Sequence, residues 1–425
     1  MSTQPTQPPA APQVTTAPAD EPAAWPIDPP LGLKSRTATG DWFGLRPALK
    51  DIGIETQFFY NNHFMSVWDG GRSTGGEKNS ATIDWLTTFD LEKMKLLNDA
   101  DVLIHVRDGW GYSINSYTGT TRALDVNDDA DGKQDLYIDQ FWFRQFFLDH
   151  KVALQLGYLD FQTIVDRNAY ANIEDRQFMN TALDNNPTFP TAGATSLGAA
   201  LYVQPVDWYT LILGTVDAQQ PGHGAPNPYY KPGFSTTFHD EAWFTSYVEN
   251  DFVLKIPTAR GPLVGNYRFG MVYDPRVRPI FVRRWERPDQ RGQDYGWYLS
   301  FDQQVFREND RDAQGLGWFF RYGWRHEDIN QFDGFWSTGL SYTGLVPERD
   351  ADTLGFGIAQ LRTSDDFQAV RNPSAGSETV YELYYAIQVT PWLVVTPDIQ
   401  YVDNPGANDT LPHVIVGGVR VRMTF

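Results

Sequence analysis

Hydrophobic and polar residues alternate one by one along most of this chain. In the segment 378–389, Tyr381 and Leu383 share one face while Glu378 and Glu382 lie on the other. Successive side chains of a β-strand point to opposite faces, so a period of two predicts strands and an all-β chain. Sixteen segments carry this pattern: 54–67, 81–92, 101–108, 137–148, 151–159, 197–204, 207–217, 242–256, 263–274, 296–307, 316–325, 334–343, 353–362, 378–389, 392–402 and 412–425.

The two faces of the predicted strands differ in kind. In 316–325, Trp318 and Phe320 oppose Arg321 and Arg325. Charged residues in mid-strand suit a water-filled interior, and large aromatic residues near strand ends are typical of the girdles of membrane barrels. A soluble β-sandwich or a propeller also alternates, so the periodicity alone leaves these architectures open.

The connections between the predicted strands alternate between long and short. The long connections 109–136 and 160–196 are each followed by a tight turn, at 149–150 and 205–206. This order gathers long loops at one rim and short turns at the other, as in outer-membrane barrels. The alternation weakens at 326–333, which is as short as the turns beside it. We predict a closed antiparallel transmembrane β-barrel of about sixteen strands, with long extracellular loops and short periplasmic turns.

Composition narrows the function further. The sequence has 53 acidic and 34 basic residues, and this acidic balance argues against a nucleic-acid partner, which would require a basic patch. Cysteine is absent, which excludes disulfides, cysteine-ligated metals and cysteine nucleophiles. No apolar run approaches the roughly 20 residues of a membrane helix. The seven histidines are scattered and form no H-E-x-x-H motif, so we expect a protein that is not an enzyme.

The first residues are unlike the rest. Residues 1–36 are rich in Pro, Ala, Thr and Gln and carry almost no periodic apolar positions. Such a segment cannot bury enough surface to offset its ordering entropy, so we predict a flexible tail over 1–36 and a barrel domain over 37–425. The tail lacks the basic and apolar regions of a secretory signal, so we expect an exported protein whose signal is absent from this sequence.

Both ends of the predicted barrel carry a recognisable sequence. Residues 40–46 read GDWFGLR, residues 390–406 read TPWLVVTPDIQYVDNPG, and the chain ends at Phe425 after an alternating strand. These segments resemble the opening and closing signatures of the carbohydrate-selective porin family (OprB-type) of Gram-negative outer membranes. The resemblance extends over about 37–425. It implies a sixteen-stranded barrel in the bacterial outer membrane through which sugars pass by diffusion.

The resemblance also implies partners. The terminal Phe425 is expected to be read by the outer-membrane assembly machinery, and the barrel is expected to contact membrane lipid and lipopolysaccharide. The carbohydrate would be the transported substrate. Whether the barrel acts alone, as a homo-oligomer or within an outer-membrane complex stays open at this point.

A sixteen-stranded barrel encloses a wide aqueous bore, so selectivity requires a constriction. We predict that 160–196, the longest connection, folds inward and narrows the pore; its segment 168–186 is the best helix candidate in the chain. Arginine and carboxylate side chains hydrogen-bond sugar hydroxyls, and Arg321 and Arg325 are expected to face water. The same charges could instead pair with one another and only support the wall. The candidate pore-lining residues are Arg107, Arg144, Arg176, Arg268, Arg321, Arg325, Glu382 and Asp398.

Two other functions compete with sugar transport. The first is an anion porin or a general-diffusion porin. An anion porin would use a ladder of basic residues along its lumen, and the acidic balance of the chain argues against it. A structural outer-membrane barrel would be tethered through the tail 1–36.

An acidic loop provides a candidate metal site. Residues 125–135 read DVNDDADGKQD and place Asn127, Asp129, Asp131 and Asp135 in the order N-x-D-x-D-G-x-x-D. Alternate oxygen ligands followed by glycine are typical of calcium loops, so we predict Ca²⁺ here and no other cofactor. A solvated acidic rim, or one bridged to lipopolysaccharide by divalent ions, is the alternative.

Overall fold

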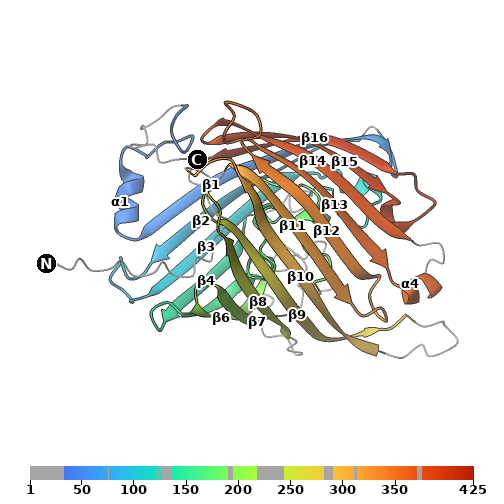
Figure 1. Cartoon of the computed structure of the whole chain (residues 1–425), viewed down its shortest axis with the longest axis horizontal. Coiled ribbons are helices and arrows are strands. Elements are labelled where there is room, and N and C mark those ends of the chain that lie inside the picture. Colours follow the sequence, from blue (N-terminus) through green and yellow to red (C-terminus); the bar gives the residue numbers. More distant parts are fainter. Residues whose placement is uncertain are drawn as a thin grey trace.

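A computed structural model shows sixteen antiparallel strands that close into one barrel (Figure 1). Each strand pairs with its neighbours in sequence, and the first strand closes the barrel against the last. The predicted fold class is confirmed. The structure describes residues 33–74, 76–122, 124–125, 136–189, 195–217, 244–281, 291–310, 314–370 and 376–425.

Every predicted strand segment corresponds to one observed strand. The largest differences are at β9, which continues to Pro279, and at β10, which begins at Arg291. In these extensions Pro, Arg, Gly, Gln and Asp stand where apolar residues would alternate, so the pattern that predicts strands fades while backbone pairing continues. The strands are β1 Ile54–Gly70, β2 Glu77–Asp90, β3 Ala100–Gly111, β4 Tyr137–Phe147, β5 Val152–Asp160, β6 Thr195–Val206, β7 Tyr209–Asp217, β8 Phe244–Ile256, β9 Leu263–Pro279, β10 Arg291–Arg307, β11 Gly315–Arg325, β12 Phe332–Thr343, β13 Thr353–Thr363, β14 Ser377–Thr390, β15 Leu393–Asp403 and β16 Val414–Thr424.

The helices are short and lie outside the strands, α1 before β1 and the others in connections. The predicted helix over 168–186 is wrong, because only its end is helical, as α3. Gln177 Oε1 instead accepts hydrogen bonds from the backbone N–H groups of Asn172 (2.8 Å) and Ile173 (3.1 Å), which holds the chain in turns. No helix of the described residues is long and apolar enough to cross a membrane. The helices are α1 Leu45–Asp51, α2 Asn115–Thr118, α3 Thr181–Asp184 and α4 Asp365–Val370, with the 3₁₀ turns η2 Phe161–Thr163 and η4 Pro405–Ala407.

The alternation of the sequence becomes an apolar exterior and a polar interior. On β14, Leu383 is 43% exposed on the outside, while Glu382 is 1% exposed on the inside. Aromatic rings stack across neighbouring strands on the outer face, as Phe58 does with Trp85 at 5.1 Å. An outward apolar face of this kind suits a lipid environment.

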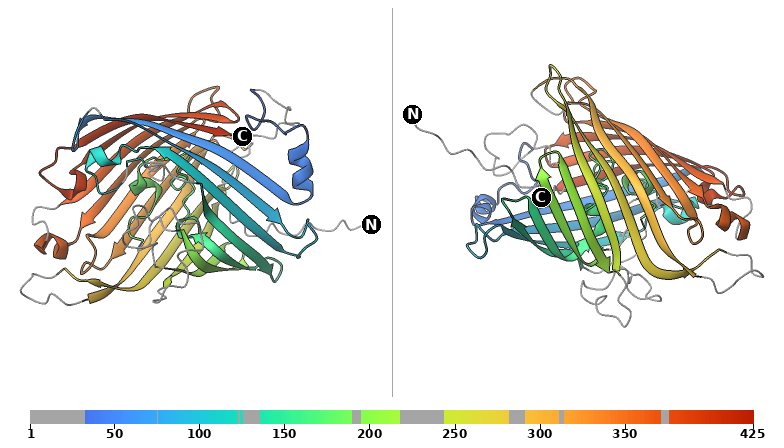
Figure 2. Two further views of the ribbon diagram at one scale, coloured as in Figure 1. Left: turned by 180° about the vertical axis from the view of Figure 1, so that it is seen from behind. Right: turned by 60° about the horizontal axis from the view of Figure 1, so that its bottom comes forward.

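The two rims of the barrel differ. Figure 2 shows α1 at one end and α4 at the opposite end. The rim with α1 carries the short turns, and the rim with α4 carries the long connections. The wall is uneven, because β5 and β7 have nine residues each while β9 and β10 have seventeen.

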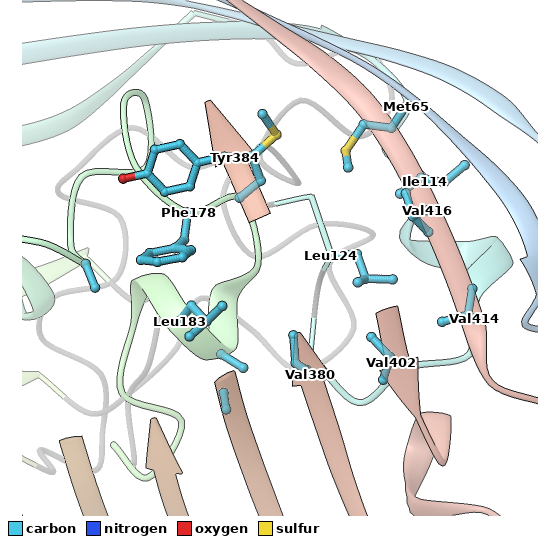
Figure 3. Packing of buried hydrophobic residues seen from close by; sticks show 14 of the residues in the cluster. Met65, Ile114, Leu124, Phe178, Leu183, Val380, Tyr384, Val402, Val414 and Val416 are labelled. Carbon is cyan, nitrogen blue, oxygen red and sulfur yellow. The ribbon is translucent and has the colours of Figure 1, made fainter. Parts of the chain in front are cut away.

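The core lies inside the barrel, where a connection packs against the wall. Phe178 and Leu183 of the β5–β6 connection form one apolar cluster with Tyr384 of the wall (Figure 3). Phe319 of the wall belongs to the same cluster. Phe178 meets Tyr384 edge to face, with ring centroids 5.0 Å apart. A second cluster joins Phe161, Ile164, Val165 and Phe189 of the same connection to Trp142, Tyr247 and Tyr298.

Candidate pore constriction

The connection between β5 and β6 lies inside the barrel and is called the inner loop here; its described part is 161–189. Side chains start its two helical turns. Asp160 accepts a hydrogen bond from Gln162 N (2.9 Å) at η2, and Asn180 Oδ1 accepts one from Ala182 N (2.9 Å) at α3. Such caps satisfy backbone donors that a short helix leaves unpaired.

Arg321 on β11 binds the inner loop at several points. Its Nη1 donates to Leu183 O (2.7 Å), and its Nη2 donates to Ala171 O and to Asn172 Oδ1 (3.1 Å). Its Nε lies 3.3 Å from Asp166 Oδ2. The side chain is fully buried, so the prediction that Arg321 faces water is wrong. The inner loop covers it, and contacts this distant in sequence leave no local pattern.

Two arginines on β16 hold the middle of the inner loop. Arg420 donates to the carbonyl oxygens of Glu174 (2.8 Å) and Gln177 (2.9 Å), and Arg422 pairs with Asp175. Burial alone would raise the pKa of Asp175, but the guanidiniums of Arg422, Arg176 and Arg420 together outweigh it and the pKa is lowered. Alternation already places Arg420 and Arg422 on the polar face of the last strand, so the sequence carried a signal for both.

Two of the predicted carboxylates meet beside α3. Glu382 accepts hydrogen bonds from Met179 N (2.5 Å) and Asn180 N (3.0 Å). Asn180 Nδ2 donates to Gln400 Oε1 (3.0 Å), and Gln400 Nε2 donates to Asp398 Oδ1 (2.9 Å). Glu382 and Asp398 therefore belong to one buried network that fixes this end of the inner loop.

Glu249 on β8 holds the start of the inner loop and was not predicted. Its Oε2 accepts hydrogen bonds from Asp166 N (2.7 Å) and from the Tyr298 hydroxyl (2.7 Å). Asn168 Nδ2 donates to Phe301 O (3.1 Å) on β10. The sequence signal that could have identified Glu249 is a single glutamate on the inward face of a predicted strand.

Burial also acts on a carboxyl group of the inner loop itself. It raises the pKa of Asp184 in α3 to about 7, while the Arg321 and Arg420 guanidiniums act in the opposite direction. Asp184 is 3% exposed, and its Oδ1 has no hydrogen-bond partner among the described residues.

Arg107 joins the inner loop to β3 of the wall. Its Nε donates to Asp84 Oδ1 (2.6 Å) and its Nη2 to Glu174 Oε1 (2.8 Å). His105 lies between two carboxylates, 2.9 Å from an oxygen of Asp84 and 2.9 Å from an oxygen of Asp139. The Glu174 side chain is 45% exposed, so this pair presents charge to water.

The other predicted residues have different partners or positions. Arg144 pairs with Asp101 near the short-turn rim, and Arg268 pairs with Asp302 (2.6 Å) within the wall. Arg325 lies at the end of β11 toward the long-connection rim. Its side chain is 11% exposed, so it is mostly buried. Arg176 is partly buried on the inner loop.

A second connection, between β3 and β4, is also tied inside the barrel. Thr121 N donates to Glu378 Oε2 (2.8 Å), and Arg122 Nη2 donates to Pro187 O (2.6 Å) of the inner loop. The candidate calcium ligands of this connection lie outside the described residues, so the calcium site stays a prediction. They are Asn127, Asp129, Asp131 and Asp135.

Comparison with known proteins decides the family. A model of the family "Carbohydrate-selective porin, OprB family" matches residues 84–425. The chain belongs to this family. This porin is 23% identical to Porin B of Pseudomonas aeruginosa over 433 residues, covering 92% of each chain. It is also 23% identical to the putative porin QuiX of Acinetobacter baylyi over 428 residues, covering 91% of this chain and 92% of that one.

Solved structures support the same architecture. The high-pH structure of Pseudomonas putida OprB superposes with a TM-score of 0.80 at 21% identity, covering 92% of this chain and 99% of that one. The predicted resemblance is confirmed. This porin lies in the bacterial outer membrane and passes carbohydrates by passive diffusion, and family and fold indicate a channel rather than an enzyme.

Proposed function

We propose that the inner loop forms the selective constriction of this carbohydrate porin. The observation that carries the proposal is that wall residues from opposite sides of the barrel all bind this one connection. Arg321 and Arg420 donate to its carbonyl groups, and Glu249 and Glu382 accept from its N–H groups. An unobstructed sixteen-stranded barrel would leave a wide aqueous channel, so a segment fixed across it determines which solutes pass.

Sugar recognition in this proposal depends on groups that face both water and the inner loop. The Arg107–Glu174 pair meets this requirement, with side chains 13% and 45% exposed. A guanidinium donates and a carboxylate accepts, so the pair can bind adjacent sugar hydroxyls on either side. The buried Arg321 and Glu382 hold the inner loop in place and act on the sugar only through its position.

Liposome swelling with sugars of increasing size tests the proposal. Glu174→Gln removes the exposed carboxylate and should change the glucose-to-maltose rate ratio by about threefold, because lining groups and diameter set selectivity. Glu55→Gln is the matched control, since Glu55 is 52% exposed and pairs with Lys50 near the short-turn rim. An unchanged ratio in Glu174→Gln and in Arg107→Gln would place the filter elsewhere.

We also propose that Phe425 is read during assembly and that the exterior contacts lipid and lipopolysaccharide. Phe425 N donates to Phe58 O (2.9 Å), so the last residue belongs to the seam where the barrel closes. Phe425→Ser should lower the amount of barrel in the outer membrane without changing the conductance of inserted channels. A normal amount would contradict this role.

A further inference from the structure

Four arginines gather inside the barrel toward the long-connection rim. Arg276 and Arg278 lie near the end of β9, Arg325 ends β11, and Arg122 comes from the β3–β4 connection. Arg276 and Arg278 are 23% and 30% exposed, and Arg325 is 11% exposed. Arg325 lies within electrostatic range of the other three. We call these four residues the rim arginine cluster.

The acidic partners of the cluster lie behind it. Asp274 and Asp294 face each other directly across the β9–β10 ladder, and both side chains are 0% exposed. Arg276 reaches Asp274 (2.6 Å), Arg278 reaches Asp274 (2.6 Å) and Asp294 (3.2 Å), and Arg325 pairs with Asp294. The carboxylates are therefore shielded, and the guanidiniums present the charge that water meets.

Arg122 adds a positive charge to the cluster, and the hydrogen bond of its guanidinium goes to a backbone carbonyl rather than to a carboxylate. Its Nη2 donates to a backbone carbonyl, that of Pro187 (2.6 Å), and its Nε has no hydrogen-bond partner among the described residues. Its charged neighbour is Glu378, whose Oε2 already accepts two backbone N–H groups. Even with Glu378 counted, the arginines outnumber the carboxylates.

Two arginines would suffice to neutralise two opposed carboxylates. The surplus places like charges near one another, which costs free energy unless an anion binds there. Guanidinium groups match carboxylate and phosphate oxygens in bidentate geometry. The surplus counts only the carboxylates that pair with or neighbour these arginines. Glu327, Asp328, Asp365 and Asp366 form an acidic group of their own on the same rim, and the chain as a whole has a formal charge of −19.

A further cation lies in the inner loop. Arg167 has two side-chain nitrogens, Nε and Nη1, that are buried and without a hydrogen-bond partner among the described residues. It lies within electrostatic range of Tyr202, which is on the half of β6 nearer the short-turn rim. The inner loop therefore carries a further positive charge, deeper in the barrel than the rim arginine cluster.

We propose that the rim arginine cluster binds the anionic group of acidic carbohydrates, so that this porin takes up sugars carrying a carboxylate or a phosphate. The proposal rests on the proposed function and names its substrate class. A weak anion site at the mouth raises the local concentration of such sugars, and the hydroxyl-binding groups beside the inner loop act on the same molecule next.

Proteoliposome uptake of glucuronate, glucose 6-phosphate and glucose tests the proposal. The wild-type protein should take up glucuronate or glucose 6-phosphate faster than glucose. Arg278→Gln and, separately, Arg276→Gln should lower that ratio about fivefold and leave glucose uptake unchanged, since each loses a charged hydrogen-bond donor. The two anions distinguish a carboxylate ligand from a phosphate ligand. Arg260→Gln is the control, because this exposed arginine lies on the opposite rim and donates to Arg307 O.

Several results would overturn the proposal. One is an unchanged ratio in both variants, and another is an equal loss of glucose and glucuronate uptake, which would indicate a supporting role for the cluster. A third is a change in chloride selectivity alone, with the sugar ratio constant. Failure of the wild-type protein to pass glucose at all would instead contradict the porin function itself. The separate variants keep the test valid if one of them fails to insert.

Discussion

Arg321 and Arg325 lie four residues apart on the same face of β11, yet they belong to regions with different roles. Arg321 is fully buried and binds backbone carbonyl groups of the inner loop. Arg325 lies in the rim arginine cluster and pairs with a wall carboxylate. The two residues are of the same type and lie on the same strand face. The groups that contact each guanidinium therefore decide its role.

The two regions also respond differently to the loss of a charge. At the inner loop, a guanidinium is the buried partner of several groups that would be left unpaired without it. At the rim, Arg276 and Arg278 are partly exposed, and their loss changes the local potential more than the packing. Variants of the inner loop should therefore alter structure and flux together, and variants of the rim should alter flux alone.

The largest effect is expected for Arg321→Met, which keeps the bulk and removes the charge. Loss of one partner from a buried charged network costs about 3–5 kcal/mol, so the inner loop should leave its position while the barrel stays inserted. Trypsin should then cut after Arg167 and Arg176, with the fragments identified by mass spectrometry. Arg260→Met, at an exposed position, is the control. Equal protection of both sites in Arg321→Met and wild type would contradict this expectation.

A smaller effect is expected from a change at an uncharged contact between the inner loop and the wall. A Cβ added to Gly317 would lie 2.1 Å from Cζ of Tyr170. Gly317→Val should therefore destabilise the docked inner loop by about 1–3 kcal/mol through overpacking. The temperature at which the barrel loses its heat-modifiable mobility on gels should fall.

A matched valine separates this contact from a general effect of valine. At Gly334, the nearest atom to an added Cβ is Arg362 Nε, at 3.3 Å, in a flexible side chain. Gly334→Val should change that temperature far less. Equal shifts in the two variants would show that the Tyr170 contact has no special role.

Glu382→Gln should have a more modest effect. The carboxylate accepts from two backbone N–H groups, and an amide has one acceptor oxygen, so one charged hydrogen bond is lost at about 1.5 kcal/mol. Channels should stay open but show more current noise as the α3 end of the inner loop fluctuates. Glu55→Gln serves as the exposed control, and equal noise in the two variants would count against the role of Glu382.

The smallest effect should be a pH dependence from Asp184. Its pKa is raised by burial to about 7, above its ordinary value of 3.8, so the docked inner loop holds a proton that the undocked one releases. Docking is therefore strongest below about pH 4 and weakens as the pH rises through about 7. Current noise should increase from pH 5 to pH 8 in wild type, and Asp184→Asn should remove the increase. A persistent increase in the variant would assign it to another group.

The wall of the barrel and the inward fold of the connection 160–196 could be predicted from the sequence, but the contacts that hold this connection could not. Alternation is local, so it correctly placed Leu383 outside and Glu382 inside. The prediction that Arg321 faces water failed because its partners Leu183 and Ala171 are far away in sequence. No pattern in the residues near Arg321 indicates these contacts. The helix expected over 168–186 failed because Asn and Gln side chains compete for the backbone. The net charge likewise gave no sign of the rim arginine cluster.

The central claim is that wall arginines fix the inner loop across the bore. Single-channel conductance of the double variant Arg321→Met, Arg420→Met tests it most directly, recorded with and without glucose. Inserted channels should conduct several-fold more than wild type, as expected when a constriction is lost, and glucose should no longer reduce the current. A folded double variant with wild-type conductance and wild-type glucose block would contradict the claim.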